Sequence, residues 1–276
     1  MSAARAELGN GVAVVTGGGS GFGRALAQRL AAEGMQVAVA DLALANAREV
    51  ARELPRAAAF RVDVGDAGSI AELARSVAAL GAPLRVVCAN VGVQQIAPLE
   101  RLTGEDWRWL VGVNLLGSVA TVDAFLPLLR RTAGLRRILL TTSTSACYAA
   151  PRLGAYTASK YGLLGYGETL RQELAGEGIG VTCVLPAGMR TAHLASSAAA
   201  KPAAAGPSQT TADDIAVVGA AAAARPGDTA SPEHAARHVV AALLENRPYL
   251  VTHGGTPPAV RARFAALLEA FERADD

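Results

Sequence analysis

The sequence predicts a single α/β domain built on a doubly wound, seven-stranded parallel sheet with helices on both faces. Short apolar runs alternate along the chain with longer segments whose apolar residues recur every three or four positions, the pattern of strand, helix and strand units. Runs such as 12–15 (VAVV) are apolar throughout, as expected for strands covered on both faces. A glycine-rich turn after the first strand and right-handed crossovers favour the strand order 3-2-1-4-5-6-7.

The elements follow in order along the chain. We expect strands at Val12–Thr16, Gln36–Ala40, Ala59–Val64, Arg85–Ala89, Arg137–Thr142, Val181–Leu185 and Tyr249–Thr252. The clearest helical periods lie at Gly23–Glu33, Ile70–Leu80 and Ala155–Ala175. A further helix is expected to begin at Thr103–Asp106, before Trp107 and Trp109, whose rings we expect to pack in a core or an interface rather than to bind a ligand.

The region 191–230 interrupts this alternation. It contains alanine runs, Pro202, Pro207 and Pro226, without a sustained period, which fits either a disordered linker or a lid over a substrate, because long loops in compact domains are often functional. Order returns at Ser231-Pro232, a helix N-cap followed by proline. A last helix, 257–273, should carry one apolar stripe that needs a partner surface: Val260, Phe264, Leu267, Leu268 and Phe271.

Composition narrows the possible partners. The 276-residue chain has a formal net charge of +2, and both signs are dispersed along it, so neither nucleic-acid nor membrane binding is expected. The three cysteines have no metal-like spacing, and His234 and His238 lack a third ligand, so we expect no metal. No signal-peptide pattern is evident at the N-terminus. We therefore expect a cytoplasmic protein, one domain over 1–276, that acts on small molecules.

The glycine-rich turn 16–23 (TGGGSGFG) lies directly between a strand and a helix. Glycines there permit a tight turn and the close approach of a pyrophosphate to the N–H groups of a helix N-terminus. The residues expected to bind a dinucleotide are Gly17, Gly19, Ser20, Gly21, Phe22 and Gly23. Asp41 ends the second strand, where a carboxylate binds ribose hydroxyls and repels a 2′-phosphate, so we expect NAD rather than NADP. A purely structural turn and a solvated aspartate are the alternatives.

Tyr156 and Lys160 form the most specific pair in the sequence. Residues four apart share a helix face, so the ammonium is expected beside the phenol. A cation there lowers the tyrosine pKa from about 10 and makes the phenol usable as a general acid and base. The chain has only two lysines, Lys160 and Lys201, among 26 basic residues, so this spacing is improbable by chance.

Together these motifs resemble the short-chain dehydrogenase/reductase superfamily, in its common single-domain branch with a Rossmann-type fold. The resemblance covers residues 10–255 and rests on Gly17-x-x-x-Gly21-x-Gly23, Asn90-Val91-Gly92, Asn114, Ser143 and Tyr156-x-x-x-Lys160. It implies that Tyr156 is the catalytic acid and base, that Lys160 binds the nicotinamide ribose and lowers the tyrosine pKa, and that Ser143 binds the substrate oxygen. Asn114 would hold a helix kink and a proton-relaying water.

The resemblance also assigns the remaining cofactor contacts. Asp63 and Val64 would contact the adenine, Asn90 and Gly92 would support the cofactor at the centre of the sheet, and Pro186, Met189 and Thr191 would lie under the nicotinamide. Two departures from the family pattern occur: Ala187 stands where glycine is usual, and residues 88–92 read CANVG rather than ending in NNAG. A homodimer or homotetramer is implied as well.

The expected reaction is the interconversion of an apolar secondary alcohol and its ketone with NAD. The segments expected to form the substrate pocket contain one basic residue, Arg190, which disfavours phosphorylated substrates. Candidate substrate contacts are Gln94, Ser145, Tyr148, His193 and Leu194. The alternatives are an NADPH-dependent ketoacyl or ketone reductase and, from another class, a catalytically silent dinucleotide-binding module; a sugar-nucleotide epimerase would need a longer chain.

Overall fold

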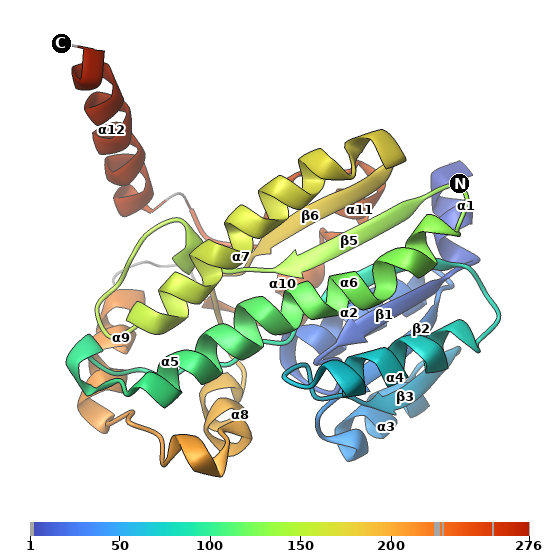
Figure 1. Ribbon diagram of the computed structural model, residues 1–276, viewed down its shortest axis with the longest axis horizontal. Coiled ribbons are helices and arrows are strands. Elements are labelled where there is room, and N and C mark those ends of the chain that lie inside the picture. Colours follow the sequence, from blue (N-terminus) through green and yellow to red (C-terminus); the bar gives the residue numbers. More distant parts are fainter. Residues whose placement is uncertain (1–2, 224–226, 228, 256, 276) are drawn as a thin grey trace.

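A computed structural model describes residues 3–223, 227, 229–255 and 257–275. Its centre is a seven-stranded parallel sheet in the order β3-β2-β1-β4-β5-β6-β9 (Figure 1), which confirms the predicted order, with β9 as the seventh strand. The strands are β1 (Val12–Thr16), β2 (Gln36–Asp41), β3 (Ala57–Arg61), β4 (Leu84–Ala89), β5 (Arg136–Thr141), β6 (Ile179–Leu185) and β9 (Tyr249–Val251).

The third strand is the one whose predicted bounds differ most. It covers Ala57–Arg61 rather than Ala59–Val64. Val62 and Val64 lie beyond the end of the strand but are still buried, at 2% and 6% exposure, so the apolar run continues past the strand. Val64 lies against Gly117, where a Cβ atom would be 2.9 Å from it. Apolar character alone therefore extended the predicted strand too far.

Helices cover both faces of the sheet, as predicted (Figure 1). Alternate residues of β1 point to opposite sides: Ala13 and Val15 join one core cluster, and Val12 and Val14 join the other. The first cluster includes side chains of α1 (Ala3–Gly9), α2 (Gly21–Ala32), α3 (Leu44–Glu53), α10 (Pro232–Ala236) and α11 (Val239–Leu244). The second includes side chains of α4 (Ala67–Ala78), α6 (Gly117–Arg130) and α7 (Gly154–Glu173).

A continuous helical stretch crosses the second face. It joins α5 (Gly104–Val111), a π-helical turn (Gly112–Leu116) and α6. By length and composition alone, residues 104–130 could cross a membrane, with 44% of the most apolar window buried. Buried core helices satisfy the same criteria, and α6 places Phe125 and Leu129 in the core at 0% exposure.

The region after β6 contains more regular structure than its sequence suggests. No helix was predicted there, but the described part forms α8 (His193–Ala200) and α9 (Ala212–Ala223). A two-stranded pair, β7 (Gly188–Met189) and β8 (Thr229–Ala230), flanks them. Alanine-rich helices lack the polar and apolar contrast from which a period is recognised. Residues 224–226 and 228 lie outside the described residues.

The last helix, α12 (Pro258–Glu272), extends away from the rest of the chain (Figure 1). Its apolar residues are exposed, from 42% for Leu267 to 74% for Phe271. The side chain of Arg263 lies 5.0 Å from the ring centre of Tyr161 on α7.

Candidate active site

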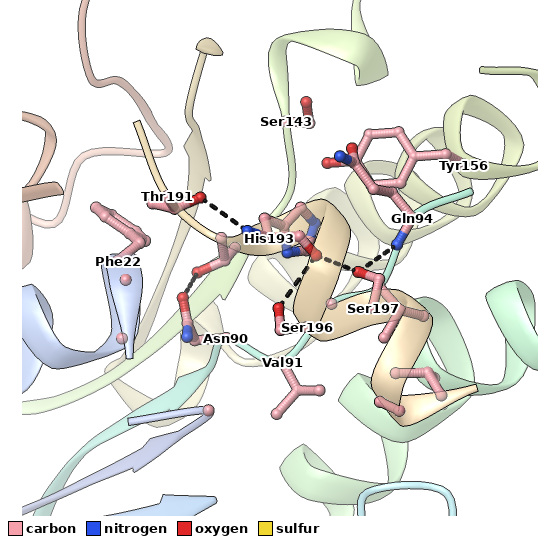
Figure 2. A pocket seen from close by; sticks show the side chains of 18 of the residues that line it. Phe22, Asn90, Val91, Gln94, Ser143, Tyr156, Thr191, His193, Ser196 and Ser197 are labelled. Atoms are coloured by element: carbon pink, nitrogen blue, oxygen red, sulfur yellow. Dashed lines mark hydrogen bonds between the residues drawn. The ribbon is translucent and has the colours of Figure 1, made fainter. Parts of the chain in front are cut away.

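One large cavity opens at the carboxyl ends of the strands. All predicted site residues line it except Gly19 and Asn114. Its volume of about 1970 Å³ exceeds the roughly 300–1,000 Å³ typical of a small-ligand pocket. In Figure 2, Phe22, Asn90 and Thr191 lie on one side of the view, Gln94 and Tyr156 lie on the other, and His193 lies between them. The cavity therefore has room for a dinucleotide and a second molecule.

The glycine turn between β1 and α2 is shaped by steric necessity. Gly17 and Gly21 have positive φ angles of 65° and 49°, a backbone conformation that residues other than glycine rarely adopt. A Cβ atom on Gly23 would lie 1.9 Å from the carbonyl oxygen of Gly17. In the described structure the N-cap residue Ser20 makes no side-chain hydrogen bond to the helix, so the first N–H groups of α2 remain available to an anion.

Asp41 lies at the end of β2, beside this turn. Its Oδ2 accepts a hydrogen bond from the Gly19 N–H at 2.9 Å, and its Oδ1 accepts one from the Ala43 N–H at 3.0 Å. These bonds hold the carboxylate at the edge of the cavity. Gly19 is buried and does not line the cavity. A side chain there would clash with the carboxylate, since a Cβ atom would lie 2.8 Å from Asp41 Oδ2.

Asn90 joins three strands at the centre of the sheet. Its Nδ2 donates to the Thr16 carbonyl oxygen at 3.0 Å, and its Oδ1 accepts from Thr141 Oγ1 at 2.9 Å. Its backbone N–H donates to Thr16 Oγ1 at 3.0 Å. Thus β1, β4 and β5 are connected where the strand order reverses, the position at which open α/β sheets bind ligands.

Asp63 and Val64 lie between β3 and α4. Asp63 Oδ1 accepts a hydrogen bond from the Gly65 N–H at 2.9 Å, and the Asp63 N–H donates to Ser69 Oγ at 3.0 Å. Both residues line the cavity. Their local bonds fix the loop that follows β3.

Ser143 and Tyr156 both face the cavity, from the loop after β5 and from α7. Burial raises the pKa of Tyr156 above its ordinary value, and the Ser143 hydroxyl lowers it in part. That Lys160 lowers this pKa stays a prediction. The Lys160 Nζ lies 5.9 Å from the centre of the tyrosine ring and bonds elsewhere.

Lys160 is 2% exposed, and its Nζ donates to the Thr141 carbonyl oxygen at 2.8 Å. Burial lowers its pKa to about 7. Gly92 makes room for it, since a Cβ atom there would lie 3.1 Å from the Nζ. The ammonium group is thus held at the floor of the cavity, at the end of β5.

Asn114 is fully buried in the π-helical turn between α5 and α6. Its Oδ1 accepts from the Val93 N–H at 2.7 Å, and its Nδ2 donates to the Val93 carbonyl oxygen and to Ser159 Oγ, both at 2.9 Å. Ser159 Oγ in turn donates to the Tyr156 carbonyl oxygen at 2.7 Å. Asn114 therefore does not line the cavity but connects its wall at Val93 to α7 below the tyrosine. A π-helical bulge often occurs at a functional site.

The turn 186–191 closes the cavity on the side of β6. The Pro186 carbonyl oxygen accepts a hydrogen bond from the Thr144 N–H at 2.9 Å. His253 Nε2 lies 2.7 Å from the Gly188 carbonyl oxygen, which supports the turn despite the alanine at position 187. The methyl group of Thr191 lies opposite Gly21, 3.4 Å from where a Cβ atom would be. Thr191 and Gly21 thus meet across the cavity.

The candidate substrate contacts lie around the opposite end. The Gln94 N–H donates to Ser197 Oγ on α8 at 3.0 Å, which joins the loop after β4 to the region 191–223. Burial, with a contribution from Lys160, lowers the pKa of His193 to about 4, so its imidazole is neutral near pH 7. Ser145, Tyr148 and Leu194 line the same cavity.

Sequence reasoning missed several residues of this site. Thr16, Thr141 and Ser159 bind the predicted residues from beneath, and Ser197 binds the backbone of Gln94. Arg108 also lines the cavity. Thr16 and Thr141 each end a strand, a position that signals contact with the cavity, whereas nothing local marks Ser197 or Arg108. Among the described residues, no three His, Cys, Asp or Glu side chains gather as metal ligands would.

Comparison with known proteins agrees with this geometry. The family model described as short chain dehydrogenase matches residues 11–231. The chain is 34% identical to D-threitol dehydrogenase of Mycolicibacterium smegmatis over 63% of its own length and 68% of that protein. It is 33% identical to a (3R)-3-hydroxyacyl-CoA dehydrogenase of Mus musculus, covering 68% and 78%. A short-chain dehydrogenase/reductase from Burkholderia phymatum, solved in complex with NAD, superposes with a TM-score of 0.82 at 28% identity, covering 97% and 96%.

Proposed function

Since the chain belongs to the short-chain dehydrogenase family, we propose that it is an NAD-dependent oxidoreductase that interconverts an apolar secondary alcohol and its ketone. The observation that carries this proposal is the cavity itself. Ser143, Tyr156 and Lys160 open into the same space as the glycine turn and Asp41. A proton-transfer group and a dinucleotide-binding turn are thereby joined in one site.

The residues present fit a dinucleotide. The helix α2 begins without a side-chain cap from Ser20, so its N-terminal N–H groups suit a pyrophosphate. Asp41 suits the adenosine ribose hydroxyls, and Lys160 suits the nicotinamide ribose. When bound, NAD supplies the acceptor for the hydride of the alcohol carbon.

The protein residues handle the proton. Ser143 holds the substrate oxygen, and the Tyr156 phenolate takes the hydroxyl proton as the carbonyl forms; in ketone reduction the phenol returns it. Since burial favours the neutral phenol, oxidation requires groups that stabilise the phenolate. The Ser143 hydroxyl does so here, and the buried ammonium of Lys160 adds positive charge on the same face of α7. Asn114 holds α7 and the loop at Val93 in register through Ser159.

The preference for NAD rests on the charge around Asp41. A 2′-phosphate placed there would meet a carboxylate, and compensation would need a cation. Arg24 lines the cavity nearby, but its guanidinium pairs with Glu53 at 2.6 Å and Glu49 at 3.6 Å. The related structure in complex with NAD supports the same choice.

The substrate class rests on the region 191–230, which we propose to be a lid. Its described part faces the cavity with Leu194, Ala199, Ala200, Val217, Val218 and Ala221. Arg108, on the opposite wall, pairs with Glu105 and is 72% exposed, so it does not supply a desolvated anion site. An apolar alcohol fits these walls better than a phosphorylated one.

A substrate panel tests the proposal. Purified protein is assayed with NAD and with NADP on aryl and alicyclic secondary alcohols, a tetritol and a 3-hydroxyacyl thioester, and the reduced cofactor is followed. We expect the highest kcat/KM with NAD and an apolar alcohol. A preference for the thioester with NADP supports the ketoacyl reductase alternative.

Paired tyrosine variants test the mechanism. Tyr156→Phe should reduce kcat by about 10²- to 10⁴-fold, the range for loss of a general acid and base, while NADH binding stays within about threefold. Tyr161→Phe on the same helix is the matched control and should retain activity. Turnover by Tyr156→Phe near that of the control refutes the assigned role, and NADH binding without turnover on the whole panel supports a silent binding module.

A further inference from the structure

The second lysine of the chain, Lys201, lies in a buried polar cluster beside the cavity. Its side chain is 2% exposed, and its Nζ lies 2.5 Å from Asp106 Oδ1, whose side chain is fully buried. The same Nζ donates to Gln95 Oε1 at 3.0 Å and to the Pro207 carbonyl oxygen at 2.8 Å. Of its three donors, two have hydrogen-bond acceptors in Gln95 and Pro207, and Asp106 supplies the opposite charge as an ion pair.

Asp106 is engaged on both of its oxygens. Its Oδ2 accepts from the Thr103 N–H at 2.8 Å and from Thr103 Oγ1 at 2.9 Å, which completes the capping box of α5. Burial raises its pKa, but the hydrogen bonds from Lys201 and Thr103 outweigh burial, so the pKa is lowered overall. The cluster is therefore a buried ion pair between the start of α5 and the residue directly after α8.

The ion pair belongs to a set of contacts that fix residues 193–223, here named the lid segment. Gln95 Oε1 also accepts from the Gln209 N–H at 3.3 Å, and the Ile96 N–H donates to Thr210 Oγ1 at 3.0 Å. Farther along, Asp214 is 2% exposed and pairs with Arg101 and, at 3.4 Å, with Arg152. The segment is thus tied to the loop after β4, to α5 and, through Arg152, to the loop before α7.

Lys201 itself does not line the cavity, whereas its neighbours Ala200 and Pro202 do. The helix directly before Lys201, α8, begins at His193, which lies among the cavity side chains in Figure 2. Ser197 of this helix accepts a hydrogen bond from the Gln94 N–H. Helix α8 therefore connects Lys201 directly to the substrate side of the cavity.

We propose that Lys201 is a positioning residue that holds the lid segment over the substrate end of the cavity through its buried pairing with Asp106. The proposal rests on the proposed function in that this end of the cavity takes a substrate. Breaking a buried pair by removing one partner leaves a charge without compensation and is far more costly than loss of an exposed pair. The lid segment should open more readily without Lys201 while the rest of the fold persists.

Hydrogen exchange and kinetics on three variants test the proposal. Lys201→Met removes the ammonium group, and the double variant K201M/D106N removes both charges and keeps an oxygen acceptor for the cap. Arg130→Met is the matched control, because it breaks an exposed pair with Glu177 outside the lid segment. We expect amide exchange within 193–223 to accelerate about 10²- to 10³-fold in Lys201→Met, which leaves one charge of the pair buried and uncompensated. The acceleration should be smaller in the double variant, which leaves no unpaired charge, and exchange should be unchanged in the control.

The kinetic readout separates positioning from chemistry. With the best alcohol, both lysine variants should raise KM about tenfold, with kcat within about threefold and the Kd for NADH within about twofold. Exchange in 193–223 at the wild-type rate overturns the proposal, as does a loss of kcat with unchanged KM, or unfolding of both lysine variants. Exchange needs no turnover, so accelerated exchange in a protein that oxidises no alcohol supports the positioning role while refuting the proposed reaction.

Discussion

The bond between Asn90 and Thr141 gives the most direct test of how the centre of the site is held. Asn90→Ala removes two side-chain hydrogen bonds, one to the Thr16 carbonyl oxygen at 3.0 Å and one from Thr141 Oγ1 at 2.9 Å. Thr16 and Thr141 are only 1% and 8% exposed. Each group left without a partner costs about 1–3 kcal/mol. With two such groups, we therefore expect the free energy of unfolding to fall by about 2–6 kcal/mol.

A double-mutant cycle isolates the shared bond. Thr141→Val removes the hydroxyl donor and should cost about 1 kcal/mol, and the double variant should cost about 1 kcal/mol less than the sum of the single variants. Urea unfolding, followed by tryptophan fluorescence at one protein concentration, measures all four proteins. Asn46→Ala, on the exposed surface of α3, is the control and should change stability by less than about 0.5 kcal/mol. Additive costs, or a cost for Asn90→Ala equal to the control, refute this account of the strand junction.

Three further outcomes follow from the site. Ser143→Ala should raise the apparent pKa of the rising, acid-side limb of alcohol oxidation, because the Ser143 hydroxyl lowers the pKa of Tyr156; kcat measured against pH checks this. Gly23→Ala should weaken NADH binding at least about tenfold, since its Cβ atom would lie 1.9 Å from the Gly17 carbonyl oxygen; fluorescence titration checks this. The folded-state pKa of Lys160 is lowered from 10.5 to about 7, so the unfolded chain binds more protons between these values and stability should rise with pH there; Lys160→Met should abolish that rise in urea midpoints.

The fold was predictable because its signals are local and repeated. Apolar runs such as β1 and the glycine turn that follows it identify a parallel sheet and its first crossover, and these fix the strand order. The bounds of the individual strands and helices were less predictable. Val62 and Val64 extend an apolar run beyond β3 because they pack against helices, and sequence pattern does not distinguish burial in a strand from burial after it. The helices of the alanine-rich lid segment were missed for the opposite reason, because polar and apolar residues do not alternate clearly along them.

The candidate site was predictable where a motif fixes the backbone and not where distant segments meet. Gly17, Tyr156 and Lys160 lie in short motifs that constrain their own geometry, and all three line the cavity. Arg108 lines it too, but only the packing of α5 shows this. The direction of the Tyr156 pKa was also beyond sequence reasoning, because burial sets it, whereas spacing along a helix reports only which residues share a face.

The two lysines show why side-chain type carries information that charge alone does not. The other 24 of the 26 basic residues are arginines, and several of these form exposed pairs, such as Arg130 with Glu177. Both lysine side chains are 2% exposed, and each bonds a backbone carbonyl oxygen, Lys160 that of Thr141 and Lys201 that of Pro207. A compact ammonium group with rotatable donors fits such sites, whereas a planar guanidinium does not. Lys201→Arg should therefore loosen the lid segment although it keeps the positive charge. Amide exchange within 193–223 at the wild-type rate would show that charge alone holds the segment.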